Sequence, residues 1–470
     1  MSVPTTPRLD AGVRATLEDA LAGWLPIQRW FSGKDRPILS VHVLADTPLS
    51  TEGAVAELHH LVVAVAQAGS TDVYQVPVSL RHELDDRLEH ALIVEVDGRL
   101  VHDALHDKEA TATLLRGFAV GQVDTLEFRA EPGAELPYDE PSIVMSVEQS
   151  NTSLVYGDAA ILKVFRRLSP GRNPDIEIHD ALTRAGCPYI AELLGWIEGR
   201  WPREVGTVEA TELGSMAMLQ RFLVTAADGW DLAKTSVRDL YAEGDLHADE
   251  VGGDFAGEAR RLGAATAQVH ATMRATLATG TLDDAEVGAR VEAMRTRLQR
   301  ALDVVAELRP YAPVLHKTYD ALADLGGPVP VQRVHGDFHL GQVVRTVSGW
   351  KLLDFEGEPT RPLAERGGLD SPLRDVAGML RSFDYAARHL LNEHPGGEAQ
   401  LSYRAGEWSA RNRGAFCEGY AEVAGRDPRE DEVLLRAYET DKAVYEAVYE
   451  AQNRPAWLAI PLAAVERLAT

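Results

Sequence analysis

A chain of 470 residues that is 45% hydrophobic is too long for one compact core and too apolar to stay disordered, so we expect two or three packed units. Its formal net charge of −25 repels the phosphates of nucleic acids and anionic lipid headgroups, which excludes both as expected partners. A site for any anionic ligand in so acidic a molecule has to be locally cationic.

Nothing in the sequence predicts export or membrane insertion. Residues 1–7 have neither a basic start nor an apolar run, and no later stretch approaches about 18 uninterrupted apolar residues. Cys187 and Cys417 lie far apart and have no second Cys or His at ligand spacing, which argues against a disulfide framework or a thiolate metal site. We expect a cytoplasmic protein, for which a monomer needs no further assumption.

The first region, residues 1–105, has the pattern of a small β-rich unit preceded by a helix. Short apolar runs alternate with clusters of Gly, Asp, Ser and Thr, which is typical of an antiparallel meander. The runs are Val41–Leu44, Leu61–Ala66, Val73–Val78 and Ala91–Val96. We expect this region to form an N-terminal cap.

The second region, residues 106–224, is predicted to be mostly β. It opens with a helical stretch from Ala104 to Gly121, and a helix from about Pro174 to Ala185 interrupts its strands. The strand signals are Val123–Phe128, Ile143–Val147, Thr152–Tyr156 and Ala160–Phe165.

The third region, residues 225–470, is largely helical. Apolar residues recur at three- and four-residue steps between Phe255 and Leu277 and between Val287 and Val305, which predicts two helices. Val343–Val344 and Leu352–Leu353 flank a Ser348-Gly349 turn and predict a β-hairpin among the helices. The three regions together indicate the α+β class.

The segment 335–342 (HGDFHLGQ), followed by Asp354-Phe355-Glu356, carries the most chemical information. Phosphoryl transfer to an alcohol needs a carboxylate that orients the hydroxyl and accepts its proton, and oxygen ligands that hold Mg²⁺ on the phosphates. Asp337 suits the first role. Gln342 and Asp354 suit the second, because a hairpin brings the residue before one strand close to the end of its partner.

The same segment permits a different chemistry. His335, Asp337 and His339 alternate, and on a strand they would project three metal ligands to one side, as in a metal-dependent hydrolase. No second His/Asp ligand set accompanies them in the sequence. We therefore favour buried, hydrogen-bonded histidines that stiffen the loop around Asp337.

The turn at Gln149, Ser150, Asn151, Thr152 and Ser153 is the second informative segment. Short polar residues in a turn can offer N–H and hydroxyl donors to phosphates. Lys163 lies in an apolar strand shortly afterwards, where a lysine is costly unless it meets an anion, so we expect it to bind the nucleotide phosphates. Glu177 on the following helix could pair with Lys163.

The strand around Met218–Leu223 is placed where a two-lobed kinase has its hinge. Backbone groups near Gln220 and Phe222 could therefore bond an adenine edge. The sequence contains neither G-x-x-x-x-G-K-[ST] nor G-x-G-x-x-G, so P-loop and dinucleotide sites have no support.

Lys163, Glu177, Asp337, Gln342 and Asp354 together resemble the eukaryotic-like kinase superfamily, in its aminoglycoside-phosphotransferase branch. Longer blocks resemble the bacterial maltokinases, and the resemblance covers nearly the whole chain. The blocks are 29–34 (RWFSGK), 147–153, 161–174, 253–262, 335–342, 353–385 (with DFEGEP, RPLAER and DSPLRDVAGMLRSFDYAA) and 441–462 (DKAVYEAVYEAQNRPAWLAIPL).

The resemblance implies a bilobal protein-kinase-like fold with an additional β-rich N-terminal cap. It implies ATP-dependent phosphorylation of maltose to maltose 1-phosphate in trehalose-to-α-glucan metabolism, with trehalose synthase as a partner. In that scheme Asp337 is the base, Gln342 and Asp354 hold Mg²⁺, Lys163 binds phosphates, and the 149–153 turn replaces the glycine-rich loop. Many kinases carry Asn where this chain has Gln342.

Sugar sites need planar polar groups for hydroxyls and aromatic faces for rings. Candidates for contacts to the sugar are His335, Glu356, Lys442, Glu446, Tyr449 and Arg454. Two other readings stay open: a related kinase acting on glucosamine or an aminoglycoside, and a non-catalytic module, although the latter does not need Lys163, Asp337, Gln342 and Asp354 together.

Overall fold

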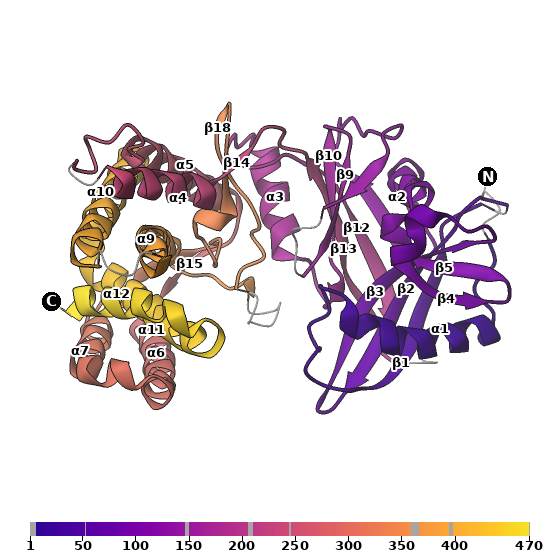
Figure 1. Ribbon diagram of the computed structural model, residues 1–470, viewed down its shortest axis with the longest axis horizontal. Helices are drawn as coiled ribbons and strands as arrows, with labels where there is room; N and C mark the ends of the chain where they lie inside the picture. Colours follow the sequence, from indigo (N-terminus) through magenta and orange to yellow (C-terminus); the bar gives the residue numbers. More distant parts are fainter. Residues whose placement is uncertain are drawn as a thin grey trace. The chain divides into compact units, whose positions relative to one another are not determined.

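The computed structural model describes residues 6–51, 53–145, 150–204, 210–243, 246–358, 366–393 and 398–469. The chain divides into two compact units, each made of two segments (Figure 1). The first unit is Met1–Glu177 with Glu192–Val224, and the second is Ile178–Ala191 with Thr225–Thr470. The second unit thus takes up a short stretch that the sequence analysis assigns to the middle region.

The first unit begins with a helix packed on an antiparallel sheet. Helix α1 (Ala11–Trp24) starts at Asp10, whose side chain accepts hydrogen bonds from the backbone N–H groups of Gly12 and Val13. The helix packs against β1 and β4, and the strand order is β1-β2-β3-β5-β4 with β11 paired to β3. The strands are β1 (Ile38–Pro48), β2 (Glu57–Gln67), β3 (Ser70–Arg81), β4 (Leu92–Val96), β5 (Arg99–Asp103) and β11 (Arg167–Leu168).

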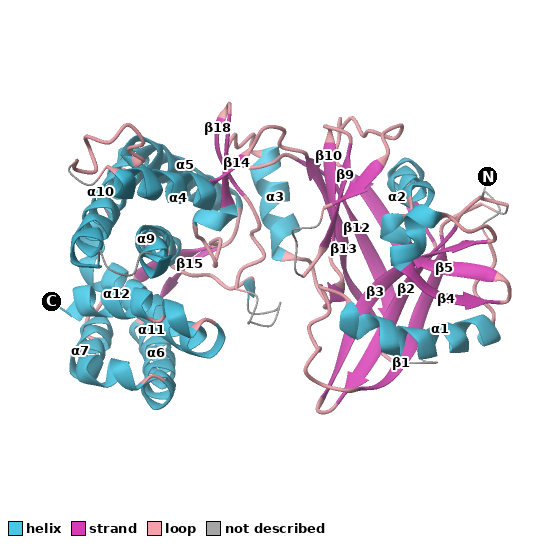
Figure 2. Ribbon diagram, in the orientation of Figure 1, coloured by secondary structure: helices cyan, strands magenta, loops and turns pink. Residues whose placement is uncertain are grey.

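A second antiparallel sheet of seven strands, β6-β7-β12-β13-β10-β9-β8, completes the first unit (Figure 2). Helix α2 (Lys108–Val120) packs against β7 and β8, and its apolar side chains share one core with β2 and this sheet. The strands are β6 (Gln122–Val123), β7 (Leu126–Ala130), β8 (Ser142–Val144), β9 (Thr152–Tyr156), β10 (Ala160–Val164), β12 (Leu193–Pro202) and β13 (Thr211–Arg221). Helix α3 (Pro174–Arg184) contains the boundary between the two units.

The second unit is mainly helical and has one large hydrophobic core. The long helix α5 packs along α10, and α9 packs against α4, α10, α11 and α12. The helices are α4 (Gly229–Ala242), α5 (Ala256–Thr276), α6 (Asp284–Val304), α7 (Ala312–Ala323), α9 (Leu373–Arg388), α10 (Glu398–Ala424), α11 (Glu432–Asn453) and α12 (Ala459–Ala469). No helix in the described ranges is both long and apolar enough to cross a membrane.

Two small sheets lie among these helices. Strand β14 (Ala227–Asp228) pairs with β17 (Val343–Thr346), which pairs with β18 (Gly349–Leu352), and β15 (Thr279–Leu282) pairs with β16 (Val329–Gln332). Thr346 and Gly349 are partners in the register, so the loop of the predicted hairpin is Val347-Ser348, one residue earlier than expected.

The predicted runs correspond to β1 to β4, α2, β7 to β10 and the helices α3, α5 and α6, and residues 146 and 147 of the predicted run Ile143–Val147 lie outside the described residues. Strand β12 was not expected from the sequence, and of β13 only the C-terminal part was. Three of the ten residues of β12 are glycine or proline, which weaken the sequence pattern of a strand. They are Gly195, Gly199 and Pro202. A Cβ at Gly195 would lie 2.5 Å from the Arg129 carbonyl oxygen of β7, so the neighbouring strand requires glycine there.

Candidate active site

Asp337 lies in a loop between β16 and β17 that is anchored to helix α9. The backbone N–H groups of His335 and Gly336 donate hydrogen bonds of 2.7 and 2.9 Å to the carboxylate of Asp375, in the first turn of α9. Gly336 has a φ of 86°, a conformation that side chains with a Cβ rarely adopt. The loop is thus held by two backbone hydrogen bonds immediately before the candidate base.

Asp375 is itself fixed by a buried histidine. His270 of α5 lies 3.0 Å from Asp375 through Nε2 and 3.0 Å from the Tyr420 hydroxyl through Nδ1. Burial acts to raise the pKa of Asp375, but the hydrogen bond and charge of His270, with the backbone donors, hold that pKa below its usual range. An ionised Asp375 is the form that can accept both loop N–H groups.

The carboxylate of Asp337 has a cationic partner from a helix distant in sequence. Lys442 of α11 donates a hydrogen bond of 3.1 Å from Nζ to Asp337 Oδ1. Burial acts to raise the pKa of Asp337, but the Lys442 ammonium, and then His339, lower it below its ordinary value. The pKa of Lys442 is raised: burial lowers it, and Asp337 and other carboxylates outweigh that effect. Asp337 is therefore a carboxylate ready to accept a proton.

The predicted pair Gln342 and Asp354 is brought together by the hairpin β17–β18. The Leu353 N–H donates to the Gln342 carbonyl oxygen at 2.9 Å, which extends the ladder by one step. Gln342 Nε2 lies 3.2 Å from Asp354 Oδ2. Asp354 has a φ of 62°, a strained conformation for a residue with a side chain. Amide and carboxylate oxygens are ligands that suit Mg²⁺, so these residues fit the ion expected there.

The two histidines beside Asp337 do not form a metal site with it. His335 is buried, and its Nε2 lies 2.8 Å from the Leu353 carbonyl oxygen. His339 caps the short helix Leu340–Gln342, where its Nδ1 accepts a hydrogen bond from the Gly341 N–H. Among the described residues these three side chains do not gather around one point. The hydrolase reading therefore has no geometric support, and His335 stiffens the loop instead of facing a sugar.

A cavity of about 690 Å³ opens beside Asp337 within the second unit. Four carboxylates line it, and each has a cationic partner. Lys442 pairs with Asp337 at 3.1 Å, Arg374 with Glu358 at 3.3 Å and with Asp370 at 3.1 Å, and Arg297 with Asp441 at 2.7 Å. Arg290 and the Tyr438 hydroxyl also bond Asp370. The wall therefore offers both N–H donors and oxygen acceptors.

Of the residues expected to contact the sugar, Lys442 lines this cavity. Glu446 is buried and accepts hydrogen bonds of 2.9 and 2.7 Å from Arg381, which corrects its expected role: the carboxylate stabilises a buried arginine. Burial raises the pKa of Glu446, and Arg381 opposes this effect.

Tyr449 and Arg454 form a cluster at the end of α11. Tyr449 is 44% exposed, and its ring stacks on that of Tyr445 with centroids 6.5 Å apart. The Arg454 guanidinium lies over the rings of Tyr449 and Trp457, at 5.4 and 4.5 Å. Glu356 lies 3.8 Å from Arg366, whose side chain lines the cavity.

In the first unit, Lys163 lies on β10 between Ser153 of β9 and Met218 of β13. Its Nζ is 3.2 Å from the carboxylate of Asp175. Asp175 is thus a partner that the sequence analysis did not name, two residues before Glu177 on α3. The pairing expected for Glu177 stays a prediction.

The polar turn is described only in part, because Gln149 lies outside the described residues. Ser150 is exposed and Asn151 is half-buried. Thr152 and Ser153 are buried at the start of β9, and the Thr152 hydroxyl accepts a hydrogen bond of 2.8 Å from Arg166 Nε. The exposed tip, and not the strand end, is therefore the part of this turn that can offer side-chain groups to a ligand.

Two backbone N–H groups near the end of β13, where an adenine contact is expected, already have partners. The Phe222 N–H donates to the Ala159 carbonyl oxygen at 3.0 Å, and the Arg221 N–H donates to Glu192 at 2.9 Å. Neither N–H group is available to an adenine. Gln220 pairs with Ile161 in the sheet, and its Nε2 is buried without a hydrogen-bond partner in the described part of the chain.

Sequence reasoning did not find Asp375 or His270. An acidic residue in the first turn of a helix is common as a partner of the helix dipole, so Asp375 gave no specific signal. His270 lies on the buried side of α5, where a histidine is equally consistent with simple packing. Their importance depends on contacts across 105 residues of sequence.

Two family models match the chain. The Maltokinase N-terminal cap domain matches residues 24–107, and the Phosphotransferase enzyme family matches residues 143–447. The chain is similar to the glucosamine kinase of Streptacidiphilus jiangxiensis, with 32% identity over 67% of this chain and 70% of that protein. It is also similar to the glucosamine kinase of Mycolicibacterium smegmatis (strain ATCC 700084 / mc(2)155), with 28% identity over 69% of this chain and 78% of that protein.

Solved structures of glucosamine kinases are also similar to this chain. A glucosamine kinase in complex with glucosamine, ADP and inorganic phosphate superposes with a TM-score of 0.68 and 26% identity, covering 91% of this chain and 93% of that one. Crystal form B of glucosamine kinase gives a TM-score of 0.70 with 25% identity, covering 96% of this chain and 99% of that one. The fold is thus kinase-like with a β-rich N-terminal cap, and the chain belongs to the phosphotransferase enzyme family and is a kinase.

Proposed function

We propose that this kinase transfers the γ-phosphoryl group of ATP to the anomeric hydroxyl of maltose. The observation that carries the proposal is the cavity beside Asp337, in which every lining carboxylate of the described chain is already paired with a lysine or arginine. An ammonium group on the substrate would need a carboxylate without such a partner. Paired guanidinium and carboxylate groups offer donors and acceptors side by side, which suits the neighbouring hydroxyls of a neutral sugar.

The cavity is large enough for a substrate of two sugar rings. Its volume of about 690 Å³ lies well within the range of about 300–1,000 Å³ that encloses drug-sized ligands. Tyr438 and Tyr445 contribute aromatic surface to the wall. Both features favour a disaccharide such as maltose.

In the proposed reaction, Asp337 orients the acceptor hydroxyl and takes its proton. The hydroxyl oxygen forms a bond to the γ-phosphorus while the bond between that phosphorus and the β,γ-bridging oxygen breaks, and ADP leaves with the electron pair. Lys442 keeps the carboxylate ionised before transfer, and Asp375 keeps the loop in place. Most of the rate enhancement then comes from positioning.

Gln342 and Asp354 would hold Mg²⁺, which neutralises phosphate charge when bound. Lys163 would bind the nucleotide phosphates from β10. The association with trehalose synthase that the family resemblance implies stays a prediction.

Glucosamine is the second candidate acceptor, because the relatives at 32% and 28% identity are named glucosamine kinases. Release of ADP should be measured with maltose, glucosamine, glucose and kanamycin in parallel. The proposal expects the highest kcat/KM with maltose. Turnover restricted to glucosamine would refute it.

The role of Asp337 has its own test. Replacement by asparagine (Asp337→Asn) keeps the shape but removes the proton acceptor, so we expect kcat to fall by about 10²–10⁴-fold while the Kd of ADP changes little. Asp303→Asn, at an exposed position near the end of α6, is the matched control and should keep full activity. Unchanged turnover in the Asp337 variant would exclude this residue as the base.

A further inference from the structure

The strand that carries Lys163 continues directly into the sheet of the N-terminal cap. Strand β10 ends at Val164 in the seven-stranded sheet, and β11 begins three residues later as a partner of β3. Between them, the Phe165 N–H donates to the Met216 carbonyl oxygen of β13, and the Arg166 carbonyl oxygen accepts from the Gln75 N–H of β3, both at 2.9 Å. Two residues therefore join the two sheets.

Arg166 is completely buried at this crossing, and its guanidinium contacts three parts of the first unit. Its Nη2 donates to Asp103 at 2.6 Å, its Nε donates to Thr152 Oγ1 at 2.8 Å, and the group lies 4.6 Å from the ring of Trp30. Trp30 and Asp103 lie in the segment that matches the cap domain, and Thr152 lies in the segment that matches the phosphotransferase family. Arg166 thus connects the cap to the start of β9.

Burying a guanidinium is costly unless its donors are satisfied with good geometry. Here Nη1 has no hydrogen-bond partner among the described residues, so the site is not an optimised ion pair. Arginine, unlike lysine, can reach Asp103 and Thr152 at once with a rigid planar fork. The arrangement therefore fixes the distance between the cap and Thr152, at some cost in stability.

Gln75 makes a second link at the same crossing. Its Nε2 donates to the carbonyl oxygens of Phe165 at 2.8 Å and Met216 at 2.6 Å, and its Oε1 lies 2.8 Å from His60 Nε2. All these groups are buried. The side chain from β3 thereby fixes the backbone on both sides of the junction, and the segment after Lys163 is held at several points.

We propose that Arg166 is a positioning residue through which the N-terminal cap sets the conformation of the nucleotide phosphate site. Asp103 and Trp30 fix the guanidinium, the guanidinium fixes Thr152, and Thr152 is the residue of the polar turn at which β9 begins. The inference rests on the proposed role of that turn and of Lys163 in binding ATP. It gives the cap a function in nucleotide binding, without any contact between cap and nucleotide.

The test uses the full chain and the binding of Mg-ADP measured by calorimetry, without sugar. Asp103→Asn keeps an oxygen for the Leu105 N–H that Asp103 caps, but removes the charge facing Arg166. Arg166→Lys keeps the charge but removes the fork. Each single variant should raise the Kd of Mg-ADP about tenfold. The double variant should raise the Kd by much less than the product of the two single-variant factors, because both substitutions act through one contact.

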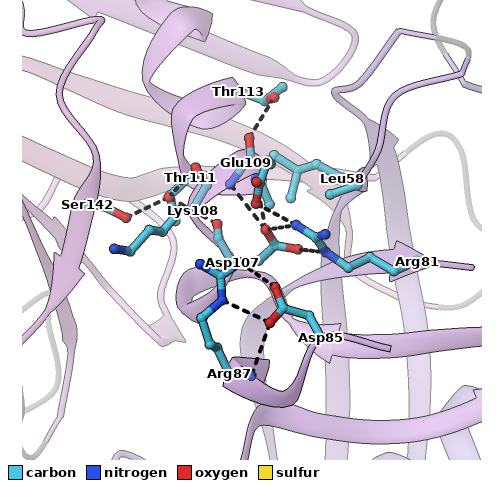
Figure 3. Close-up of polar contacts among 12 residues, drawn as sticks. Leu58, Arg81, Asp85, Arg87, Asp107, Lys108, Glu109, Thr111, Thr113 and Ser142 are labelled. Carbon is cyan, nitrogen blue, oxygen red and sulfur yellow. Dashed lines mark hydrogen bonds and ion pairs between the residues drawn. The ribbon is translucent and has the colours of Figure 1, made fainter. Parts of the chain in front are cut away.

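A matched control is available in the same unit. Arg81 makes a similar buried pair with Asp107, with hydrogen bonds of 2.7 and 2.6 Å, and also bonds Glu109 (Figure 3). These contacts lie at the start of α2 and do not include the polar turn. Arg81→Lys should lower the melting temperature and leave the Kd of Mg-ADP unchanged.

The outcomes separate this inference from the proposed function. A lower melting temperature with an unchanged Kd in Asp103→Asn, as in the Arg81 control, would show a purely structural role and overturn the inference. If Arg166→Lys does not fold, Asp103→Asn alone decides. A wild-type chain that binds Mg-ADP but phosphorylates neither maltose nor glucosamine would refute the proposed substrate, and the binding test would still stand.

Discussion

Opposing influences act on the carboxyl group of Asp337. Burial favours the neutral acid, whereas the Lys442 ammonium favours the carboxylate and lowers the pKa below its ordinary value. In the wild-type enzyme Asp337 therefore stays ionised as the pH falls through the range in which an ordinary Asp, with a pKa of about 3.9, begins to protonate. The direction of this pKa shift depends on Lys442, because the charge of Lys442 is the largest influence that lowers the pKa of Asp337.

Removing this ammonium should move the acid limb of the pH profile. In Lys442→Met, burial remains and the main lowering influence is lost, so the pKa of Asp337 should rise. The acid limb of kcat/KM should then lie at higher pH than in the wild type. Lys442→Arg keeps a cation near Asp337 and should retain most of the wild-type profile. An acid limb at the same pH in Lys442→Met would show that Lys442 does not set this ionisation.

At the scale of elements, the loop that carries Asp337 packs directly against α9, with no side chain between the two backbones at Gly378. A Cβ at Gly378 would lie 2.5 Å from the carbonyl oxygen of Phe338, directly after Asp337 in sequence. The contact is with backbone, which cannot move aside by a rotamer change. The absence of a side chain at position 378 thus determines how close the loop lies to the helix.

Adding one methyl group there should displace the loop. We expect Gly378→Ala to lower kcat at least tenfold and to destabilise the fold by about 1–3 kcal/mol, because overpacking forces the backbone to shift. Gly414→Ala is the control: this position in α10 has open space around its Cβ, so helix propensity should stabilise the protein by about 0.5–1 kcal/mol. Denaturant unfolding and steady-state rates check both. Equal behaviour of the two variants would contradict the close packing.

The hairpin is the element that sequence predicted best. Its apolar pairs and turn residues are local, so Gln342 and Asp354 could be expected to meet, and they do. Strand β12 shows the opposite case, because its position between β7 and β13 depends on glycine contacts with neighbouring strands. The partners of the Phe222 and Arg221 N–H groups could not be predicted for the same reason: Ala159 and Glu192 lie elsewhere in the chain.

At the scale of the whole molecule, a buried ionic network joins the C-terminal helices of the second unit. Asp384 of α9 accepts hydrogen bonds from Arg381, from Arg467 of α12 and from the Ser409 hydroxyl, and Arg413 of α10 lies 3.7 Å away. Burial acts to raise the pKa of Asp384, but Arg413, Arg381 and Arg467 lower it far below its usual range. Helices distant in sequence are thereby tied to α9.

This depressed pKa predicts how stability depends on pH. The contribution of Asp384 is fully present above the unfolded pKa of about 3.9 and is lost as the pH falls through the lower folded value. Asp384→Asn should destabilise the second unit by about 1.5–3 kcal/mol at pH 7, since it removes a charge that bonds buried Arg381 and faces Arg413, although these keep Glu446 and Glu439 as partners. When the pH is lowered below about 4, the Asp384→Asn variant should also lose less of its stability than the wild type does.

Urea unfolding followed at pH 7 and in acid measures both effects. Asp303→Asn replaces an exposed carboxylate and should change stability by no more than about 0.5 kcal/mol. An Asp384 variant as stable as this control would show that the network contributes nothing to the fold.

The residue types and the local elements could be predicted without the structure: the net negative charge, the α+β class, the hairpin, the candidate base Asp337 and its companions Gln342, Asp354 and Lys163. These follow from composition, periodicity and short spacing, which local physics controls. Tertiary structure alone decided that Lys442 faces Asp337, that Asp375 holds the loop, and that Glu446 is buried with Arg381. Such pairings depend on which distant helices pack together, and a side chain's role follows from the charge it meets after folding.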